Sequence, residues 1–158
     1  MIKRLSVLLV LLGAAGIVHT AYAQQSAMRF RGSDGWGITT TTGARYEQLF
    51  DNFNLQTVMA TVLRVDTATV MRDMGVAVRL VVTVDGTKEE TPVHLGPMWY
   101  ALNQDVNFPR GEKVEIRGHR TTFEKSTFIM PVEIRSKNRI FRFRDDDGNP
   151  FWGIHRTR

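Results

Sequence analysis

Apolar and polar residues alternate along much of the chain, and this period of two is typical of β-strands. The clearest run is Met74–Asp85, in which Val or Leu occupies every second position from Val76 onward. The tight-turn pair Asp85-Gly86 ends this run, so Lys88–Leu95 is the expected returning strand. Pro131, in a later run, predicts a bulge or a sheet edge. The other strands are expected at Thr57–Asp66, Lys113–Thr122, Thr127–Arg135 and Arg139–Arg144.

Two segments break this pattern with helical features. In Ala44–Phe53 the apolar residues recur at helical spacing, which predicts a short amphipathic helix. A second helix is predicted from Pro97, which a first helical turn tolerates, to near Asn103. The second helix therefore falls between the third and the fourth expected strand.

Three strands, a short helix and two strands follow one another in the order of the OB-fold, a five-stranded Greek-key barrel. We therefore predict an all-β, OB-fold-like barrel over residues 57–152, with a helix before it and a C-terminal hairpin extension. An unclosed sandwich or meander is the alternative. Trp99 is expected to plug the barrel bottom, and a partner-docking role together with Tyr100 is the alternative.

The first 23 residues have the features of a signal peptide. Lys3 and Arg4 precede the apolar stretch Leu5–Val18, and Ala21-Tyr22-Ala23 is a small-x-small cleavage site. The alternative is an uncleaved anchor, although a membrane-spanning helix needs roughly 20 apolar residues. We expect an exported, periplasmic protein with a leader over residues 24–56, in which Trp36 docks, and a basic tail over 153–158.

The composition excludes several kinds of chemistry. The 158 residues carry a formal net charge of +5, which falls to +3 without the first 23, and contain no Cys. A disulfide, a thiolate nucleophile, a zinc–thiolate site and covalent haem attachment are thereby excluded. No G-x-S-x-G motif is present either. We predict that the chain is not an enzyme and assign no catalytic residue.

Positive charge is concentrated in the second half of the chain, where residues 110–158 carry a net charge of +5 and residues 24–109 a net charge of −2. This asymmetry favours an anionic partner, such as lipid headgroups or an acidic protein surface, or else an ordinary solvated face. Nucleic acid is less favoured, because Phe141 and Phe143 are expected in the core rather than on a stacking surface. The candidate binding residues are Arg117, His119, Arg120, Arg142 and Arg144.

Two sets of residues suggest a metal site. His94 and His119 are candidates if they meet across paired strands, and Asp145, Asp146 and Asp147 share one turn. Ordinary hydrogen-bonded histidines and a solvated turn are the alternatives. No cofactor is predicted, and a divalent metal or iron is the possibility that these residues leave open.

Two resemblances bear on function. The strand order of Thr57–Arg135 is similar to that of the small secreted OB-fold family of Gram-negative bacteria. The segments Val93–Tyr100 (VHLGPMWY) and Phe141–Trp152 (FRFRDDDGNPFW) resemble a domain shared by the magnetosome proteins MamS and MamX. This second resemblance implies an accessory role in magnetite maturation. The CxxCH haem motif of MamX-type proteins is missing here, so the simpler MamS type fits better.

We therefore expect a non-enzymatic, exported OB-fold binding or accessory protein that acts through a partner protein or an anionic ligand. One alternative is an accessory protein of the magnetosome lumen that affects iron biomineralisation, held at the membrane if its N-terminal segment is retained. Another is a metal-binding periplasmic sensor built around His94 and His119.

Overall fold

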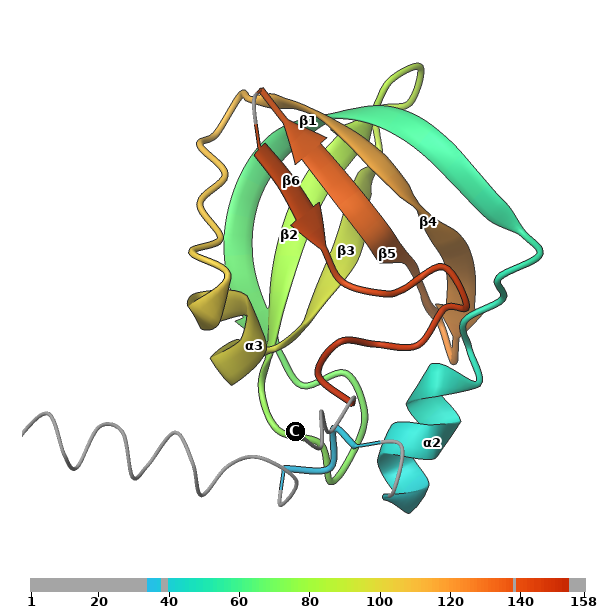
Figure 1. The fold of residues 1–158 in the computed structure, drawn as a ribbon. Helices are drawn as coiled ribbons and strands as arrows, with labels where there is room; N and C mark the ends of the chain where they lie inside the picture. The colour runs from blue at the N-terminus through green and yellow to red at the C-terminus, as the bar shows by residue number, and fades with distance from the viewer. Residues whose placement is uncertain (1–33, 38–39, 138, 154–158) are drawn as a thin grey trace, which may run out of the picture. The chain divides into compact units, whose positions relative to one another are not determined.

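The computed structural model describes residues 34–37, 40–137 and 139–153 (Figure 1). The predicted signal peptide, most of the leader before the first helix and the tail after Gly153 lie outside these residues. Among the described residues, no helix is long and apolar enough to span a bilayer. The elements, in chain order, are α2 (Thr41–Glu47), β1 (Leu55–Ala68), β2 (Ala77–Val84), β3 (Glu90–Pro97), α3 (Met98–Asn103), β4 (Lys113–Phe123), β5 (Ser126–Ser136) and β6 (Arg139–Arg142).

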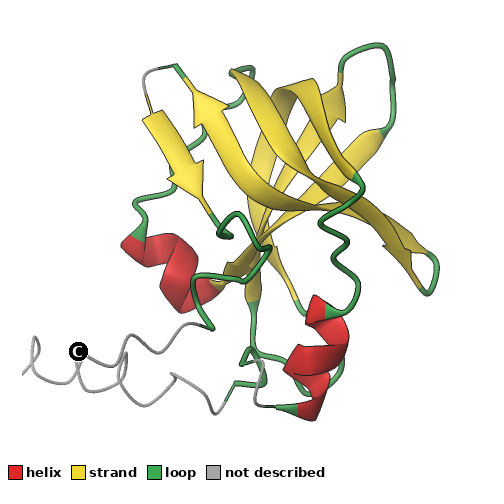
Figure 2. Ribbon diagram, turned by 45° about the vertical axis from the view of Figure 1, so that its right-hand side comes forward, coloured by secondary structure: helices red, strands yellow, loops and turns green. Residues whose placement is uncertain are grey.

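The strands close into the predicted OB-fold-like barrel (Figure 2). β1 pairs antiparallel with both β2 and β4, and two further antiparallel pairs join β2 to β3 and β4 to β5. A parallel pairing between Val93 and Ile129 links β3 to β5 and completes the ring. α3 lies between β3 and β4 in the chain, and β6 extends the sheet beside β5. The predicted fold class is confirmed.

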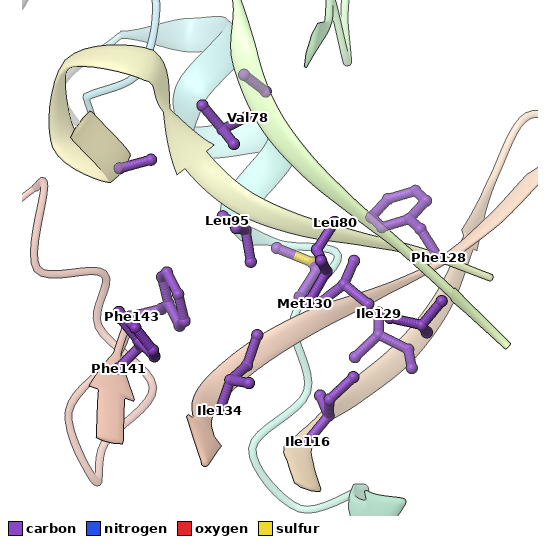
Figure 3. Packing of buried hydrophobic residues seen from close by; sticks show 14 of the residues in the cluster. Val78, Leu80, Leu95, Ile116, Phe128, Ile129, Met130, Ile134, Phe141 and Phe143 are labelled. Carbon is purple, nitrogen blue, oxygen red and sulfur yellow. The ribbon is translucent and has the colours of Figure 1, made fainter. Parts of the chain in front are cut away.

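Alternate residues of the strands fill the barrel core (Figure 3). On β2 the inward residues are Val78, Leu80, Val82 and Val84, as the alternation predicts. Val76, which belongs to the same alternating series, lies before the strand and is exposed. Phe141 and Phe143 are buried in the core, as predicted.

Pro131 sits at the predicted bulge. Arg117 of β4 pairs with Glu133 of β5, whereas the next residue, Gly118, pairs with Pro131, so Val132 is an extra residue in β5. A Cβ atom on Gly118 would lie 2.5 Å from the carbonyl oxygen of Met130. The close approach of the two strands at this bulge therefore requires glycine.

The N-terminal helix differs from its predicted bounds. α2 begins at Thr41, because the Oγ1 atom of Thr40 accepts a hydrogen bond from the Gly43 amide and caps the helix. It ends at Glu47, and the Asp51 carboxylate then accepts the Phe53 amide in a local turn that competes with helix. The prediction of helix as far as Phe53 is wrong, and the Phe53 side chain is 96% exposed.

Gly96 provides a test of the packing between β3 and the C-terminal segment. Its φ is +97°, and a Cβ atom there would lie 2.6 Å from the Trp152 ring. We expect Gly96→Ala to lower the free energy of unfolding by about 2 kcal/mol, because it adds backbone strain and displaces the indole. Gly86→Ala is the matched control, since Gly86 has a φ of +83° and open space around it. Equal urea midpoints for the two variants would contradict the described contact.

Candidate binding surfaces

OB-folds bind ligands on the face of strands two and three. In this chain that face and the adjoining part of β1 carry paired charges. The Arg79 guanidinium holds the Asp66 carboxylate through two contacts of 2.7 and 3.0 Å, and keeps the pKa of Asp66 below its usual range. Arg64 reaches from β1 to Glu90 of β3 with an ion pair of 2.8 Å. Val81 of β2, which pairs in register with Arg64 of β1 and Pro92 of β3, is only 1% exposed. The charges of the two arginines and the two acidic residues therefore sum to zero on this face.

His94 lies on the same outer surface, beside the seam between β3 and β5, and is buried there. Its ring stacks on Phe128 with 4.0 Å between ring centroids, and its Nδ1 atom is 3.3 Å from the Tyr46 hydroxyl of α2. Burial, together with the positive charge of Arg79, lowers the pKa of His94 to about 3. His94 is therefore neutral at physiological pH. It faces away from Val93 and Leu95, as the alternation predicts, but α2 covers it.

The N-terminal arm, defined as residues 34–37 and 40–50, packs on the barrel at His94 and at several other places. The Trp36 indole donates a hydrogen bond of 2.9 Å to the Gly75 carbonyl in the loop between β1 and β2, so Trp36 docks as predicted. The Asp34 carboxylate accepts a hydrogen bond of 2.9 Å from the Trp99 indole of α3. Tyr46 contacts β3 and β5 through His94 and Phe128. The arm therefore joins four separate parts of the barrel.

A buried ion pair fastens the arm to the C-terminal segment. The Arg144 guanidinium binds the Glu47 carboxylate and donates a second hydrogen bond, of 2.9 Å, to the Gly148 carbonyl. The same guanidinium stacks on the rings of Phe50 and Trp152, at 4.4 and 5.3 Å from the centroids. Burial raises the pKa of Glu47, and the charge of Arg144 opposes this. Because its side chain is only 1% exposed, Arg144 does not belong to the exposed basic surface in which sequence analysis placed it.

The two candidate metal histidines lie on strands that do not pair with each other, because β3 pairs with β2 and β5 whereas β4 pairs with β1 and β5. The idea that His94 and His119 meet across paired strands is therefore wrong. His119 instead lies edge-on to Phe50 and places its Nδ1 atom 3.1 Å from the Asn54 carbonyl.

In the acidic turn, the Asp145 carboxylate accepts the amides of Asp147 and Asn149, while Asp146 and Asp147 are exposed. Within the described ranges, no three His, Asp or Glu side chains are grouped as a metal site requires.

The outward side chains of β4, β5 and β6 form a surface that we call the basic face. Arg117, Glu133 and Arg142 lie side by side in register across the three strands, which are neighbours in Figure 1. Arg135 binds Glu133 at 2.8 Å and approaches Glu115 at 3.7 Å. The face comprises Lys113, Glu115, Arg117, Glu133, Arg135 and Arg142, four bases and two acids.

Of the predicted binding residues, the structure brings Arg117 and Arg142 together on this face. Among the described residues, neither of the two forms an ion pair or a side-chain hydrogen bond. His119 continues the same side of β4, whereas Arg120 alternates to the other side and is exposed near the hairpin end.

Residues 54–141 match the MamS/MamX magnetosome protein family. The chain belongs to this family. The match confirms the family that the sequence resembles: it includes Val93–Tyr100, whereas of Phe141–Trp152 it includes only the first residue. No curated protein matches the chain. The MamS/MamX region runs from the residue before β1 to the third residue of β6, so it contains the barrel, α3 and all of the basic face except Arg142. The N-terminal arm and Arg144 lie outside it.

Within the MamS/MamX region, α3 fills the barrel differently from the prediction. Tyr100 is the buried aromatic residue of this helix, and its hydroxyl donates a hydrogen bond of 2.8 Å to the Arg142 carbonyl of β6. Trp99 is only partly buried and is bound to Asp34 of the arm. The expectation that Trp99 plugs the barrel is wrong, because position 100 rather than 99 of this short helix faces the core.

Sequence reasoning missed the cluster in which the arm meets the MamS/MamX barrel. Tyr46 was visible as one apolar residue of an amphipathic helix, but its partner His94 looked like a surface residue between two core positions. The pair Glu47 and Arg144 is separated by 97 residues, and no local pattern connects them.

Proposed function

We propose that this chain is a non-enzymatic accessory protein of the magnetosome that acts by binding an anionic partner through its basic face. Family membership carries the proposal, because the matched residues include β4 and β5, which supply most of that face. An influence on the maturation of the iron mineral is part of it, as is export to the periplasm or the magnetosome lumen.

The charges of the basic face support an anionic partner. Arg117 and Arg142 flank Glu133, whose carboxylate already binds Arg135. Both arginines therefore remain available to carboxylates or phosphates of a partner, and Arg142 is exposed. Attraction between such exposed charges is screened within about 8 Å at physiological salt, so we expect the binding to weaken as salt rises.

The test is the amount of protein that co-purifies with magnetosomes from a magnetotactic host. We expect the double variant Arg117→Gln/Arg142→Gln to co-purify at least about tenfold less than the unmodified chain, since each surface arginine contributes on the order of 1 kcal/mol to binding an anionic surface. Quantitative immunoblots at several salt concentrations measure this.

Arg72→Gln/Lys88→Gln is the matched control, because it removes two exposed bases that do not belong to the basic face, one from the β1–β2 loop and one from the β2–β3 turn. An equal loss in both double variants would point to net charge alone and would contradict a site on the basic face. If the unmodified chain does not co-purify with magnetosomes, the proposed location is wrong.

A further inference from the structure

The N-terminal arm lies on the elements with which OB-folds hold their ligands. Those elements are the face of strands two and three and the loops after strands one and four. Here the arm contacts the β1–β2 loop at Gly75, β3 at His94 and β5 at Phe128, which follows the β4–β5 hairpin by two residues. The arm thus occupies, in the same chain, the position of a ligand.

Tyr46 is the aromatic anchor of this contact. Its ring is 1% exposed and lies parallel to the Phe128 ring, at an interplanar angle of 4°. Its hydroxyl lies 3.3 Å from the Nδ1 atom of His94, and the His94 ring itself stacks on Phe128. A fully buried tyrosine with a polar partner for its hydroxyl is a typical anchor at protein interfaces. His94 and Phe128 of the barrel surround the Tyr46 ring, and we call the place that they form for it the aromatic pocket.

Glu47, the next residue, enters a second pocket that recognises a carboxylate. Arg144 provides the cation, and Trp152 forms part of the wall. Among the described residues, the Oε1 atom of Glu47 and the Nε atom of Arg144 are buried without a hydrogen-bond partner. Glu47 thus uses only part of the binding capacity of Arg144, since a guanidinium and a carboxylate can form two parallel hydrogen bonds.

The arm depends on these two pockets for its order. α2 has seven residues, and an isolated helix of this length is not stable in water. Its order therefore comes from contacts with the barrel, those of Tyr46 and Glu47 together with the docked Trp36. His94 and Phe128 belong to the family match, whereas the arm does not. The aromatic pocket is thus part of the shared domain, and this chain fills it with a segment from outside that domain.

We propose that these pockets form a peptide-binding site which the arm fills in cis, and that a partner protein competes for it with a segment in which an acidic residue follows an aromatic one. The site is distinct from the basic face, and it does not depend on the function proposed above. The partner is recognised by stacking on His94 and Phe128 and by an ion pair with Arg144.

The test uses the full chain with the arm loosened by Tyr46→Ala/Glu47→Ala. A fluorescent peptide with the sequence of residues 34–53 is titrated against this variant and against the unmodified chain, and anisotropy reports binding. We expect the variant to bind the peptide at least tenfold more tightly than the unmodified chain, whose own arm competes at high effective concentration. A peptide carrying the same two alanines is the control, and we expect it not to bind.

A folded variant that binds neither peptide, or binds both equally, would overturn the proposal. Circular dichroism shows whether the variant is folded. If it is not, hydrogen exchange of the unmodified chain decides the question. Arm amides that exchange at least tenfold faster than those of β2 support a displaceable arm, whereas exchange only through global unfolding overturns it.

Discussion

Arg144→Met is expected to lower the free energy of unfolding by about 3–5 kcal/mol, the largest effect of any single substitution considered for this chain. The substitution leaves the Glu47 carboxylate buried without its counter-charge. It also removes the stacking on Phe50 and Trp152 and the hydrogen bond to the Gly148 carbonyl. Urea denaturation followed by tryptophan fluorescence measures the change, and Trp152 is one of the three tryptophans that report it.

The double variant Glu47→Leu/Arg144→Met distinguishes a buried charge from lost packing. We expect it to be more stable than Arg144→Met alone by at least about 2 kcal/mol, because it removes both charges and keeps apolar side chains of similar size. If the single substitution costs less than about 1 kcal/mol, the guanidinium is not buried against Glu47 as described. If the double variant is no more stable than the single one, the unpaired carboxylate is not the cause.

Acid is expected to destabilise the fold through His94, by about 2 kcal/mol between pH 7 and pH 5 and by about 4 kcal/mol between pH 7 and pH 3. The pKa of this residue falls from 6.5 to about 3 on folding, so the unfolded chain binds a proton that the folded chain does not. The stability is fully present above pH 6.5 and is lost as the pH falls toward 3. Urea midpoints at pH 7, 6 and 5 measure the loss.

His94→Phe is the control for this acid sensitivity. It keeps a ring stacked on Phe128, and we expect it to cost about 1 kcal/mol at pH 7 because the contact with the Tyr46 hydroxyl is lost. Between pH 7 and pH 5 its stability is expected to change much less than that of the unmodified chain. Glu47 has the opposite effect on stability: its pKa is raised in the folded chain, so its protonation stabilises the folded state as the pH falls. Parallel pH profiles for the two proteins would refute the assignment to His94.

The barrel could be predicted because its strands carry their own signal. In β2 the alternation of Val and Leu gives both the strand and its inward face, and Pro131 marks the bulge where β5 gains a residue. The order of the strands and the place of α3 then limit the fold to a familiar topology. The bounds of α2 were harder to predict from the sequence, because they depend on the Thr40 cap and on the turn at Asp51.

The binding surfaces could be predicted only in part. The alternation around Ile116 is enough to place Arg117 on the outside of β4, and the register with Glu133 then brings Arg142 beside it. By alternation, Arg144 was expected on the same outward face as Arg142. The strand ends at Arg142, however, and the Arg144 guanidinium stacks on the Phe50 ring. Burial of this kind depends on a segment almost a hundred residues away, so no local pattern in the sequence reports it.

The ion pair between Glu47 and Arg144 has a consequence for the order in which the protein forms during synthesis. The ribosome makes the arm before the barrel, whereas the arm's docking partners on β5 and in the C-terminal segment follow β1 to β4. Tyr46 therefore cannot stack on Phe128 until β5 has been made. Glu47 cannot form its ion pair until Arg144 has left the exit tunnel. Until then the nascent arm lacks the contacts that order it in the folded chain, and we expect it to be open to chaperones or proteases. A ribosome that stops before Arg144 would release a chain whose arm has no buried cation to hold it.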